Sequence, residues 1–295
     1  MQQDNMLRAG VIGWPVSHSL SPCLHSYWLK KYGIVGSYEA IAVTPENVAG
    51  ILEVLEQRNF KGANITVPYK EQILKQLKET DEISQRIGAV NTIVFDNNTW
   101  RGTNTDAYGF MESLRNNSDY WKDGLALVLG AGGASRAVCV GLLDEGFNVV
   151  IANRSVHKAE AVQQHINHPR LKICAWEEKE KFMPDAALLV NTTVLGMKGQ
   201  KPLEISFSRL HQAAYVADIV YNPERTARTR RFSNPTITEF LAQATEHGHQ
   251  VIDGLNMLLY QAQPGFEMWF GIKPEVTRAL RSHVLEGLLE QNEKA

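Results

Sequence analysis

The sequence predicts an α/β protein with two α/β domains, one of which is a Rossmann-like nucleotide-binding domain. Three observations support this prediction. An apolar run over residues 125–129 leads into a turn of small residues, 130–134, and then into a helix over 135–145. A second apolar strand follows over residues 148–152. Strands and helices also alternate over residues 7–106, before this turn is reached. Strand, glycine turn and helix open a mononucleotide-binding βαβ unit, and the alternation indicates layered α/β structure.

The first domain is expected over residues 1–106. Pro22, preceded by Ser21, is typical of a first helical position, and the predicted helix runs to Tyr32. A further helix is expected from Thr44, because apolar residues recur there at helical spacing. Asn97 fits the turn of a hairpin. The predicted strands are 9–13, 37–43, 62–67, 89–95 and 98–102, and the remaining predicted helices are 69–77 and 81–87.

The nucleotide-binding domain is expected over residues 107–253, preceded by a helix from Thr105. Its strands are predicted near positions 125, 148, 171, 187 and 215. The C-terminal segment, residues 254–295, contains an apolar helix after Asp253 and an amphipathic helix over 274–292. We expect both of these helices to return to the first domain.

The glycine turn fits a pyrophosphate. Glycines permit backbone angles that side chains forbid, and they let an anion approach the amides at a helix N-terminus. The third position of G-x-G-x-x-G is Ser135, which is small enough for close packing of helix on strand. An ordinary glycine-rich turn is the alternative, and the second strand favours the nucleotide site. The residues of the turn are Gly130, Ala131, Gly132, Gly133 and Ala134.

The end of the second strand indicates the cofactor. NAD-binding units usually place an acidic residue there to hold the ribose 2′-hydroxyl. This chain has Arg154 instead, and a guanidinium suits the 2′-phosphate of NADP. In the alternative interpretation Arg154 is a solvated charge and Ser155 is the N-cap of a helix over 156–166, although capping is compatible with phosphate binding.

Composition excludes several classes of protein. Of the 295 residues 44% are hydrophobic and 21% charged, with a formal net charge of −2, so nothing favours nucleic acid or membrane as the main partner. No signal peptide is evident, and no apolar run is long enough for a bilayer. The three cysteines, Cys23, Cys139 and Cys174, have no metal or redox spacing, so we expect small buried thiols and a cytoplasmic location. The histidines form no convincing metal site, and His247 and His249 are expected in a turn between a helix and a strand.

Four polar segments of the first domain exceed what packing requires. Each follows a predicted strand or opens a helix, so turn or capping roles remain open for Ser21, Thr66 and Asp106. Lys70 taken alone would be a solvated surface lysine. The segments are His18–Pro22, Asn64–Lys70, Ala89–Thr92 and Gly102–Asp106.

Taken together and in order, the motifs of this chain resemble those of the shikimate and quinate dehydrogenase family. The resemblance covers nearly the whole length. Each motif alone is weak, and their common order makes the signal strong. They are H-S-x-S-P, N-x-T-x-P-x-K, A-V-N-T, N-T-D-x-x-G, G-A-G-G-A, N-R-S and G-x-x-M-L-x-x-Q-A.

The resemblance implies NADPH-dependent reduction of 3-dehydroshikimate to shikimate, a step of aromatic amino-acid biosynthesis. It implies Lys70 and Asp106 as catalytic residues. It implies substrate contacts from Ser19, Ser21, Thr66, Asn91, Tyr221 and Gln261. For the cofactor it implies the glycine turn together with Glu82, Asn153, Arg154, Ser155, Val156, His157, Lys158, Ile219 and Gly254.

The chemistry agrees with these roles. Hydride transfer to a ketone carbon leaves charge on the oxygen, which needs a nearby proton donor. The Lys70 ammonium is such a donor, and a neighbouring Asp106 carboxylate would favour its charged form. No metal is required.

One stretch departs from the family pattern. A basic insertion, residues 225–237, follows Tyr221 and contains Arg225, Arg228, Arg230 and Arg231. We expect a solvated loop, and the alternatives are a cover for the cofactor or a contact with another subunit. The insertion makes the role of Tyr221 less secure.

Two rival functions remain at this point. One is an NAD-dependent quinate/shikimate dehydrogenase, which the paired serines and Arg154 disfavour. The other is a non-catalytic NADP-sensing protein, for which Lys70 would be dispensable. The oligomeric state is expected to be monomer or homodimer.

Overall fold

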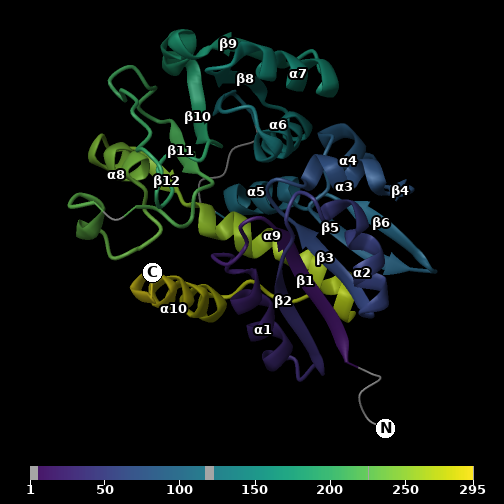
Figure 1. Ribbon diagram of the computed structural model, residues 1–295. Coiled ribbons are helices and arrows are strands. Elements are labelled where there is room, and N and C mark those ends of the chain that lie inside the picture. Colours follow the sequence, from purple (N-terminus) through teal and green to yellow (C-terminus); the bar gives the residue numbers. More distant parts are fainter. Residues whose placement is uncertain (1–5, 117–122, 225, 295) are drawn as a thin grey trace. The chain divides into compact units, whose positions relative to one another are not determined.

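The computed structural model describes residues 6–116, 123–224 and 226–294 (Figure 1). The chain forms two compact units. Unit 1 contains the chain up to Thr105 and again from Leu259, and unit 2 contains Asp106 to Leu258. Unit 1 is therefore discontinuous in sequence. Within the described residues, no helix is long and apolar enough to span a bilayer.

Unit 1 is built on a six-stranded mixed sheet with the order β2-β1-β3-β5-β6-β4. Strands β1, β2 and β3 are parallel, whereas β5 is antiparallel to both of its neighbours. The elements are β1 Leu7–Gly13, α1 Ser21–Lys31, β2 Gly36–Ala42, α2 Ile51–Gln57, β3 Phe60–Ile65, α3 Lys70–Gln76, β4 Glu79–Thr80, α4 Glu82–Ile87, β5 Thr92–Asp96 and β6 Thr99–Thr103.

The C-terminal helices return to unit 1, as predicted. They are α9 Gly254–Phe270, of which the part from Leu259 belongs to unit 1, and α10 Arg278–Lys294. The Trp269 indole of α9 donates a hydrogen bond to the Ile93 carbonyl of β5 at 2.9 Å. Helix α10 lies beside α1 (Figure 1), where its residues Leu280, Val284 and Leu288 are buried.

Unit 2 contains a six-stranded sheet in which every pair is parallel, with the order β12-β11-β10-β7-β8-β9. Chain order reverses between β7 and β10, which makes this the topological switch point where open α/β sheets bind ligands. The elements are α5 Asp106–Arg115, β7 Leu125–Leu129, α6 Gly133–Glu145, β8 Asn148–Asn153, α7 Val156–Ile166, β9 Leu171–Ala175, β10 Ala186–Asn191, β11 Tyr215–Asp218, α8 Glu239–Glu246 and β12 Gln250–Ile252.

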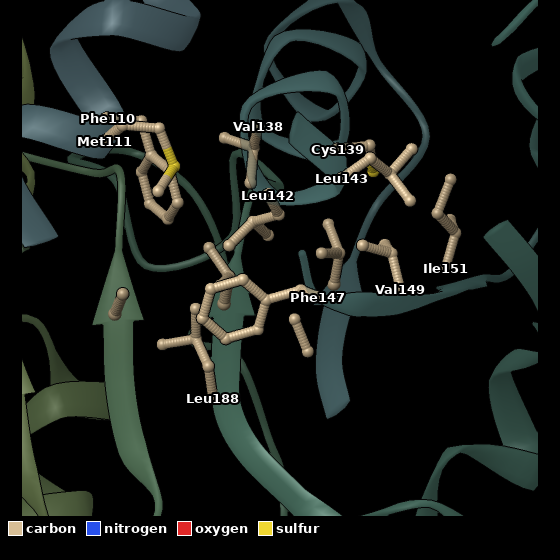
Figure 2. Packing of buried hydrophobic residues seen from close by; sticks show 14 of the residues in the cluster. Phe110, Met111, Val138, Cys139, Leu142, Leu143, Phe147, Val149, Ile151 and Leu188 are labelled. Atoms are coloured by element: carbon tan, nitrogen blue, oxygen red, sulfur yellow. The ribbon is translucent and has the colours of Figure 1, made fainter. Parts of the chain in front are cut away.

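Alternation along the parallel strands separates two cores. In β8, Val149 and Ile151 belong to one cluster, and Val150 and Ala152 belong to the other. The first cluster contains Phe147 and residues of α5 and α6 (Figure 2), and the second contains residues of α8. Because both faces are covered, the central strands are apolar over most of their length, which is why they were recognisable in the sequence.

The last helix was predicted four residues too early. Residues 274–277 precede α10 because their backbone groups bond to side chains instead of forming a helical turn. The Pro274 carbonyl accepts from Gln263 Nε2 at 2.7 Å, and the Glu275 carbonyl accepts from Trp28 Nε1 at 3.1 Å. The Thr277 hydroxyl then accepts from the Leu280 amide at 3.2 Å, which starts the helix.

Other boundaries also differ from the prediction, among them the following. Ser21 is the first residue of α1, and its amide donates to the Ser19 hydroxyl at 3.3 Å. The helix expected from Thr44 begins as a 3₁₀ turn at Val48, and α2 starts only at Ile51, because residues 44–47 form a separate turn. Strand β5 starts at Thr92, three residues later than predicted.

Candidate active site

The serine loop and the Thr66 loop lie together in unit 1. Strands β1 and β3 are adjacent and parallel, so the loops that follow them leave the sheet at the same edge. The Thr66 amide donates to the Ile12 carbonyl at 2.9 Å, and the Trp14 amide donates to Val67 at 3.1 Å. Ser19 is half-buried and Ser21 is buried in this loop. Polar side chains from two loops thus converge on one edge.

Asn91 is the centre of a buried network at this edge. Its Oδ1 accepts from the Thr105 amide at 2.8 Å and from the Thr92 hydroxyl at 2.9 Å. Its Nδ2 donates to Thr105 Oγ1 at 3.0 Å and to Gln261 Oε1 at 3.3 Å. The network continues through Asn64, which donates to Thr92 Oγ1 at 3.0 Å. Two predicted substrate residues, Asn91 and Gln261, are therefore in direct contact although 170 positions separate them.

Two aromatic side chains, Tyr38 and His25, pack beside this network and hold Asn64. The Tyr38 hydroxyl donates to Asn64 Oδ1 at 2.6 Å, and burial raises the pKa of Tyr38, so the phenol stays protonated. The buried His25 ring stacks on Tyr38 with a centroid distance of 4.0 Å and an interplanar angle of 9°. Burial lowers the pKa of His25 to about 3, which keeps the imidazole neutral.

Lys70, Glu82 and Asp106 each begin a helix. Lys70 is half-buried at the start of α3, and its carbonyl accepts from the Val90 amide at 3.0 Å. Glu82 is exposed at the start of α4, where Asp81 provides the cap by accepting from the Ser84 amide at 3.0 Å. Asp106 is 5% exposed and begins α5, the first element of unit 2. Lys70 and Asp106 thus belong to different units, and their pairing is treated as a proposal below.

The glycine turn of unit 2 has the shape of an anion cradle. Gly130 has φ +110°, and a Cβ built on it would lie 2.9 Å from Thr192 Oγ1, so this position requires glycine. At Gly132 and Gly133 a Cβ would meet no atom within 4 Å. Gly132 is the N-cap of α6 and supplies no side-chain cap. The first amides of α6 are therefore open to a pyrophosphate, and the turn fits the dinucleotide that the sequence implied.

The segment after β8 offers cationic groups near this turn. The Gly130 amide donates to the Ala152 carbonyl at 2.9 Å, which joins the turn to the end of β8. Arg154 is exposed and forms no side-chain hydrogen bond or ion pair within the described part of the chain. Ser155 is the N-cap of α7, as in the alternative interpretation, although its hydroxyl contacts the His157 ring at 2.9 Å instead of capping an amide. The exposed side chains of Val156 and Lys158 follow.

The loops after β10 and β11 flank the switch point. The Thr192 hydroxyl donates to the Leu129 carbonyl at 2.7 Å, next to the glycine turn. Ile219 is half-buried, and a Cβ on Gly254 would lie 2.4 Å from the Ile219 carbonyl oxygen, so the start of α9 lies directly against the loop after β11. Tyr221, half-buried, follows in the same loop.

The basic insertion was expected to be a solvated loop. In its described part, residues 226–237, Arg228 and Asn234 bind side chains elsewhere in unit 2. Arg228 pairs with Glu239 and, at 3.2 Å, with Glu246, so the insertion is attached to α8. Residues 229–231 form a 3₁₀ turn, and Asn234 Nδ2 donates to Asp253 Oδ2 at 2.7 Å. Arg225 lies outside the described residues.

Sequence reasoning missed the supporting polar residues. Asn64 lies within the quoted N-x-T-x-P-x-K motif, and Thr105 lies within N-T-D-x-x-G, but neither was given a role. Asp218, at the end of β11, was not mentioned at all. It is 2% exposed, and burial raises the pKa of its carboxyl to about 7. A carboxylate in an otherwise apolar strand was the signal available for finding it.

The described residues offer no thiol or histidine cluster for a metal. No group of three or more potential metal ligands occurs among the described residues. All three cysteines are free; Cys139 and Cys174 are buried as predicted, whereas Cys23 is only half-buried. His247 and His249 lie between α8 and β12, in the predicted turn.

These features define a class of protein: a dinucleotide-binding dehydrogenase with a separate, polar substrate-binding unit. Comparison with known proteins is more specific. Residues 11–93 match the shikimate dehydrogenase substrate-binding domain, residues 112–222 match shikimate/quinate 5-dehydrogenase, and residues 254–281 match the shikimate 5′-dehydrogenase C-terminal domain. The chain belongs to the shikimate dehydrogenase family.

Individual relatives agree with this assignment. The shikimate dehydrogenase (NADP⁺) of Paramagnetospirillum magneticum is 44% identical over 94% of this chain and 97% of its own length. The Thermus thermophilus shikimate 5-dehydrogenase, solved in complex with NADP(H) and shikimate, is 35% identical with a TM-score of 0.81, covering 97% of this chain and 99% of that one. Quinate dehydrogenase from Corynebacterium glutamicum in complex with NAD is 27% identical with a TM-score of 0.83, covering 95% and 99% of the two chains.

Proposed function

We propose that this chain catalyses the NADP-dependent interconversion of 3-dehydroshikimate and shikimate in the shikimate pathway. It is thus an oxidoreductase that acts on a CH–OH group. One observation carries the proposal: the chain is 44% identical to an NADP-dependent shikimate dehydrogenase over 94% of its length. The serine and Thr66 loops of unit 1 and the glycine turn of unit 2, which follow the ends of parallel strands, support it. Ligands bind at that edge in open α/β sheets.

The cofactor fits the residues of unit 2. The open amides of Gly132 and Gly133 would hold the pyrophosphate, and Arg154 would hold the 2′-phosphate. Ile219 and Gly254 would border the nicotinamide, which supplies a hydride when bound. The turn would be completed by Gly130, Ala131 and Ala134, and the adenosine end by Asn153, Ser155, Val156, His157 and Lys158. Exposed Glu82, on α4 of unit 1, is the least supported member of this set.

The substrate would bind at the polar edge of unit 1. Ser19 and Ser21 would donate hydrogen bonds to its carboxylate, with Tyr221 nearby. Thr66, Asn91 and Gln261 would bind its hydroxyl and carbonyl groups. The buried contact between Asn91 and Gln261 supports this assignment, because it orients the two amides before any ligand arrives.

Lys70 would act as general acid in the reductive direction. As the ketone carbon receives hydride, the Lys70 ammonium donates a proton to the carbonyl oxygen, giving the alcohol and a neutral amine. In the oxidative direction the neutral amine accepts the hydroxyl proton. A carboxylate at Asp106 would favour the ammonium form and orient it.

The deciding experiment measures steady-state rates with shikimate and with quinate, each with NADP⁺ and with NAD⁺. We expect the highest kcat/KM for shikimate with NADP⁺. Faster NAD-linked oxidation of quinate would support the rival quinate/shikimate dehydrogenase, to which the structural likeness to the Corynebacterium enzyme also points.

A Lys70→Ala variant tests catalysis against mere NADP sensing. We expect a rate loss of about 10²- to 10⁴-fold with unchanged NADP⁺ affinity, because a general acid is removed without touching the cofactor site. Wild-type activity in this variant would refute the mechanism. Lys75→Ala, in the last turn of the same helix, is the matched control and should retain full activity.

The remaining expectations concern assembly and location. A monomer or homodimer is proposed, and sedimentation velocity distinguishes the two. The three free thiols support a reducing compartment such as the cytoplasm.

A further inference from the structure

The Asp218 carboxyl group connects three segments of unit 2. Its Oδ1 accepts from Asn191 Nδ2 at 2.9 Å and from the Val220 amide at 3.0 Å. Its Oδ2 accepts from the Thr238 hydroxyl at 2.7 Å, and Thr238 caps α8 by accepting from the Leu241 amide at 3.1 Å. One buried side chain therefore fixes the end of β10, the loop after β11 and the start of α8.

Two of these segments, the loop after β10 and the loop after β11, lie at the proposed cofactor site. Asn191 Oδ1 accepts from the Thr193 amide at 3.0 Å, which orders the loop beside Gly130. On the other side, the Ile219–Val220 backbone lies between the Asp218 carboxylate and Gly254, where even a Cβ would overlap it. The backbone at Ile219 is thus held from both sides.

The contact between β10 and β11 accounts for only one of the hydrogen bonds of Asp218. A buried carboxyl costs free energy unless its acceptors are satisfied, and an apolar side chain at this position would avoid the cost. One of the three hydrogen bonds joins Asp218 to Asn191, its partner on the neighbouring strand β10. The other two go to the loop after β11 and to the cap of α8. The carboxyl group acts on the geometry of the loops at the switch point.

We propose that Asp218 is a positioning residue for hydride transfer, which holds Ile219 and the loop after β10 in the arrangement that orients the nicotinamide. This inference rests on the proposed function. It assigns Asp218 no contact with substrate or cofactor. Asp218 acts through Asn191, Val220 and Thr238.

The test compares Asp218→Ala with Asp218→Asn. The alanine variant loses all three hydrogen bonds, and we expect kcat for shikimate oxidation to fall by about 100-fold, the scale of a misplacement of about 1 Å. The asparagine variant keeps an oxygen toward Asn191 and Val220, and its amide can donate to Thr238 Oγ1. We expect it to retain kcat within about threefold.

Two further measurements separate positioning from general destabilisation. In Asp218→Ala the affinity for 2′,5′-ADP, a probe of the adenosine end, should stay within about twofold. The primary isotope effect on kcat for 3-dehydroshikimate reduction, measured with NADPH deuterated at the transferred position, should rise, because hydride transfer becomes slower than product release. The control is Arg170→Ala, which removes hydrogen bonds to Gly146 and Leu143 at the opposite edge of the sheet and should lower the melting temperature without changing the isotope effect.

The outcomes are distinct. Wild-type kcat in Asp218→Ala, or equal losses of kcat in the alanine and asparagine variants, would overturn the inference. If Asp218→Ala does not fold, Thr238→Val takes its place, since it removes one of the three bonds, and an unchanged isotope effect there would also overturn it. Failure of the wild-type chain to oxidise shikimate with NADP⁺ would instead count against the proposed function.

Discussion

At the scale of single residues, the buried polar groups have the most specific roles. The Asn91 side chain uses both its nitrogen and its oxygen in hydrogen bonds. Its Nδ2 donates to the Thr105 hydroxyl, and its Oδ1 accepts from the Thr92 hydroxyl and the Thr105 backbone amide, so its orientation is fixed. Arg154 is the opposite case, an exposed cation next to the glycine turn. The first type of residue preorganises a site, and the second is available for a charged ligand.

Replacing Arg154 by alanine should change cofactor preference. A charge-assisted hydrogen bond to a phosphate contributes about 1.5–3 kcal/mol, so we expect KM for NADP⁺ to rise by about 10- to 100-fold. KM for NAD⁺, which has no 2′-phosphate, should stay nearly constant. Steady-state kinetics with both cofactors check this, and Lys158→Ala provides a comparison with a second exposed cation of the same segment. Equal effects on both cofactors would contradict the assignment.

His25 should make the stability of the protein depend on pH. Its pKa is about 3 in the folded protein and near 6.5 when exposed, so the unfolded chain binds the proton more tightly. This histidine costs no stability above about pH 6.5, and stability falls as the pH is lowered from there toward 3. Near pH 5 the loss amounts to about 2 kcal/mol.

The measurement is urea unfolding across this pH range. A His25→Phe variant keeps an aromatic ring against Tyr38 and cannot titrate, so its stability should decline less steeply below about pH 6.5. Parallel pH profiles for the two proteins would mean that another group is responsible.

At the scale of elements, local sequence patterns predicted where the helices and strands lie. Side-chain contacts explain why some of these elements begin or end at other residues than predicted. The apolar runs of unit 2 were located to within a residue or two, and β10, predicted near position 187, spans Ala186–Asn191. Helix α10 starts late because Gln263 and Trp28, both distant in sequence, bind the backbone at 274–275. No local pattern contains that information.

The glycine turn allows a test that separates folding from binding. Gly130→Ala should destabilise the protein by about 1–3 kcal/mol, since its φ is positive and Thr192 lies in the way. Gly132→Ala has open space and an extended backbone, so the melting temperature should not change. We expect NADP⁺ affinity to fall at least about 10-fold in Gly132→Ala, because a methyl group would cover the amides. Thermal melts and titration calorimetry check both variants.

At the scale of the whole molecule, unit 1 is assembled from both ends of the chain. The part from Leu259 contributes Trp269, which is hydrogen-bonded to β5, and Gln261, which is hydrogen-bonded to Asn91. Unit 2 is continuous and contains its complete parallel sheet. The substrate side therefore depends on the last residues of the chain, and the cofactor side does not.

Truncation after Leu258 tests this dependence. The shortened chain should bind 2′,5′-ADP within about threefold of the full chain, because unit 2 is intact. It should show no shikimate binding, since Gln261 and the core residues Phe266 and Trp269 are missing. Calorimetry with each ligand checks the prediction, and the full chain is the control. Shikimate binding at full-length affinity would contradict the dependence on α9.

The sequence by itself determined the α/β class, the glycine turn, the basic segment after β8 and the order of the motifs, because these follow from short-range periodicity and from residue types at fixed spacing. Only the tertiary structure decided which polar residues meet. The Asn91–Gln261 contact joins positions 170 residues apart, and the Asp218 hydrogen bonds join three segments between Asn191 and Thr238. Such contacts depend on strand order and on the path of α9, which non-local packing sets and local pattern does not encode.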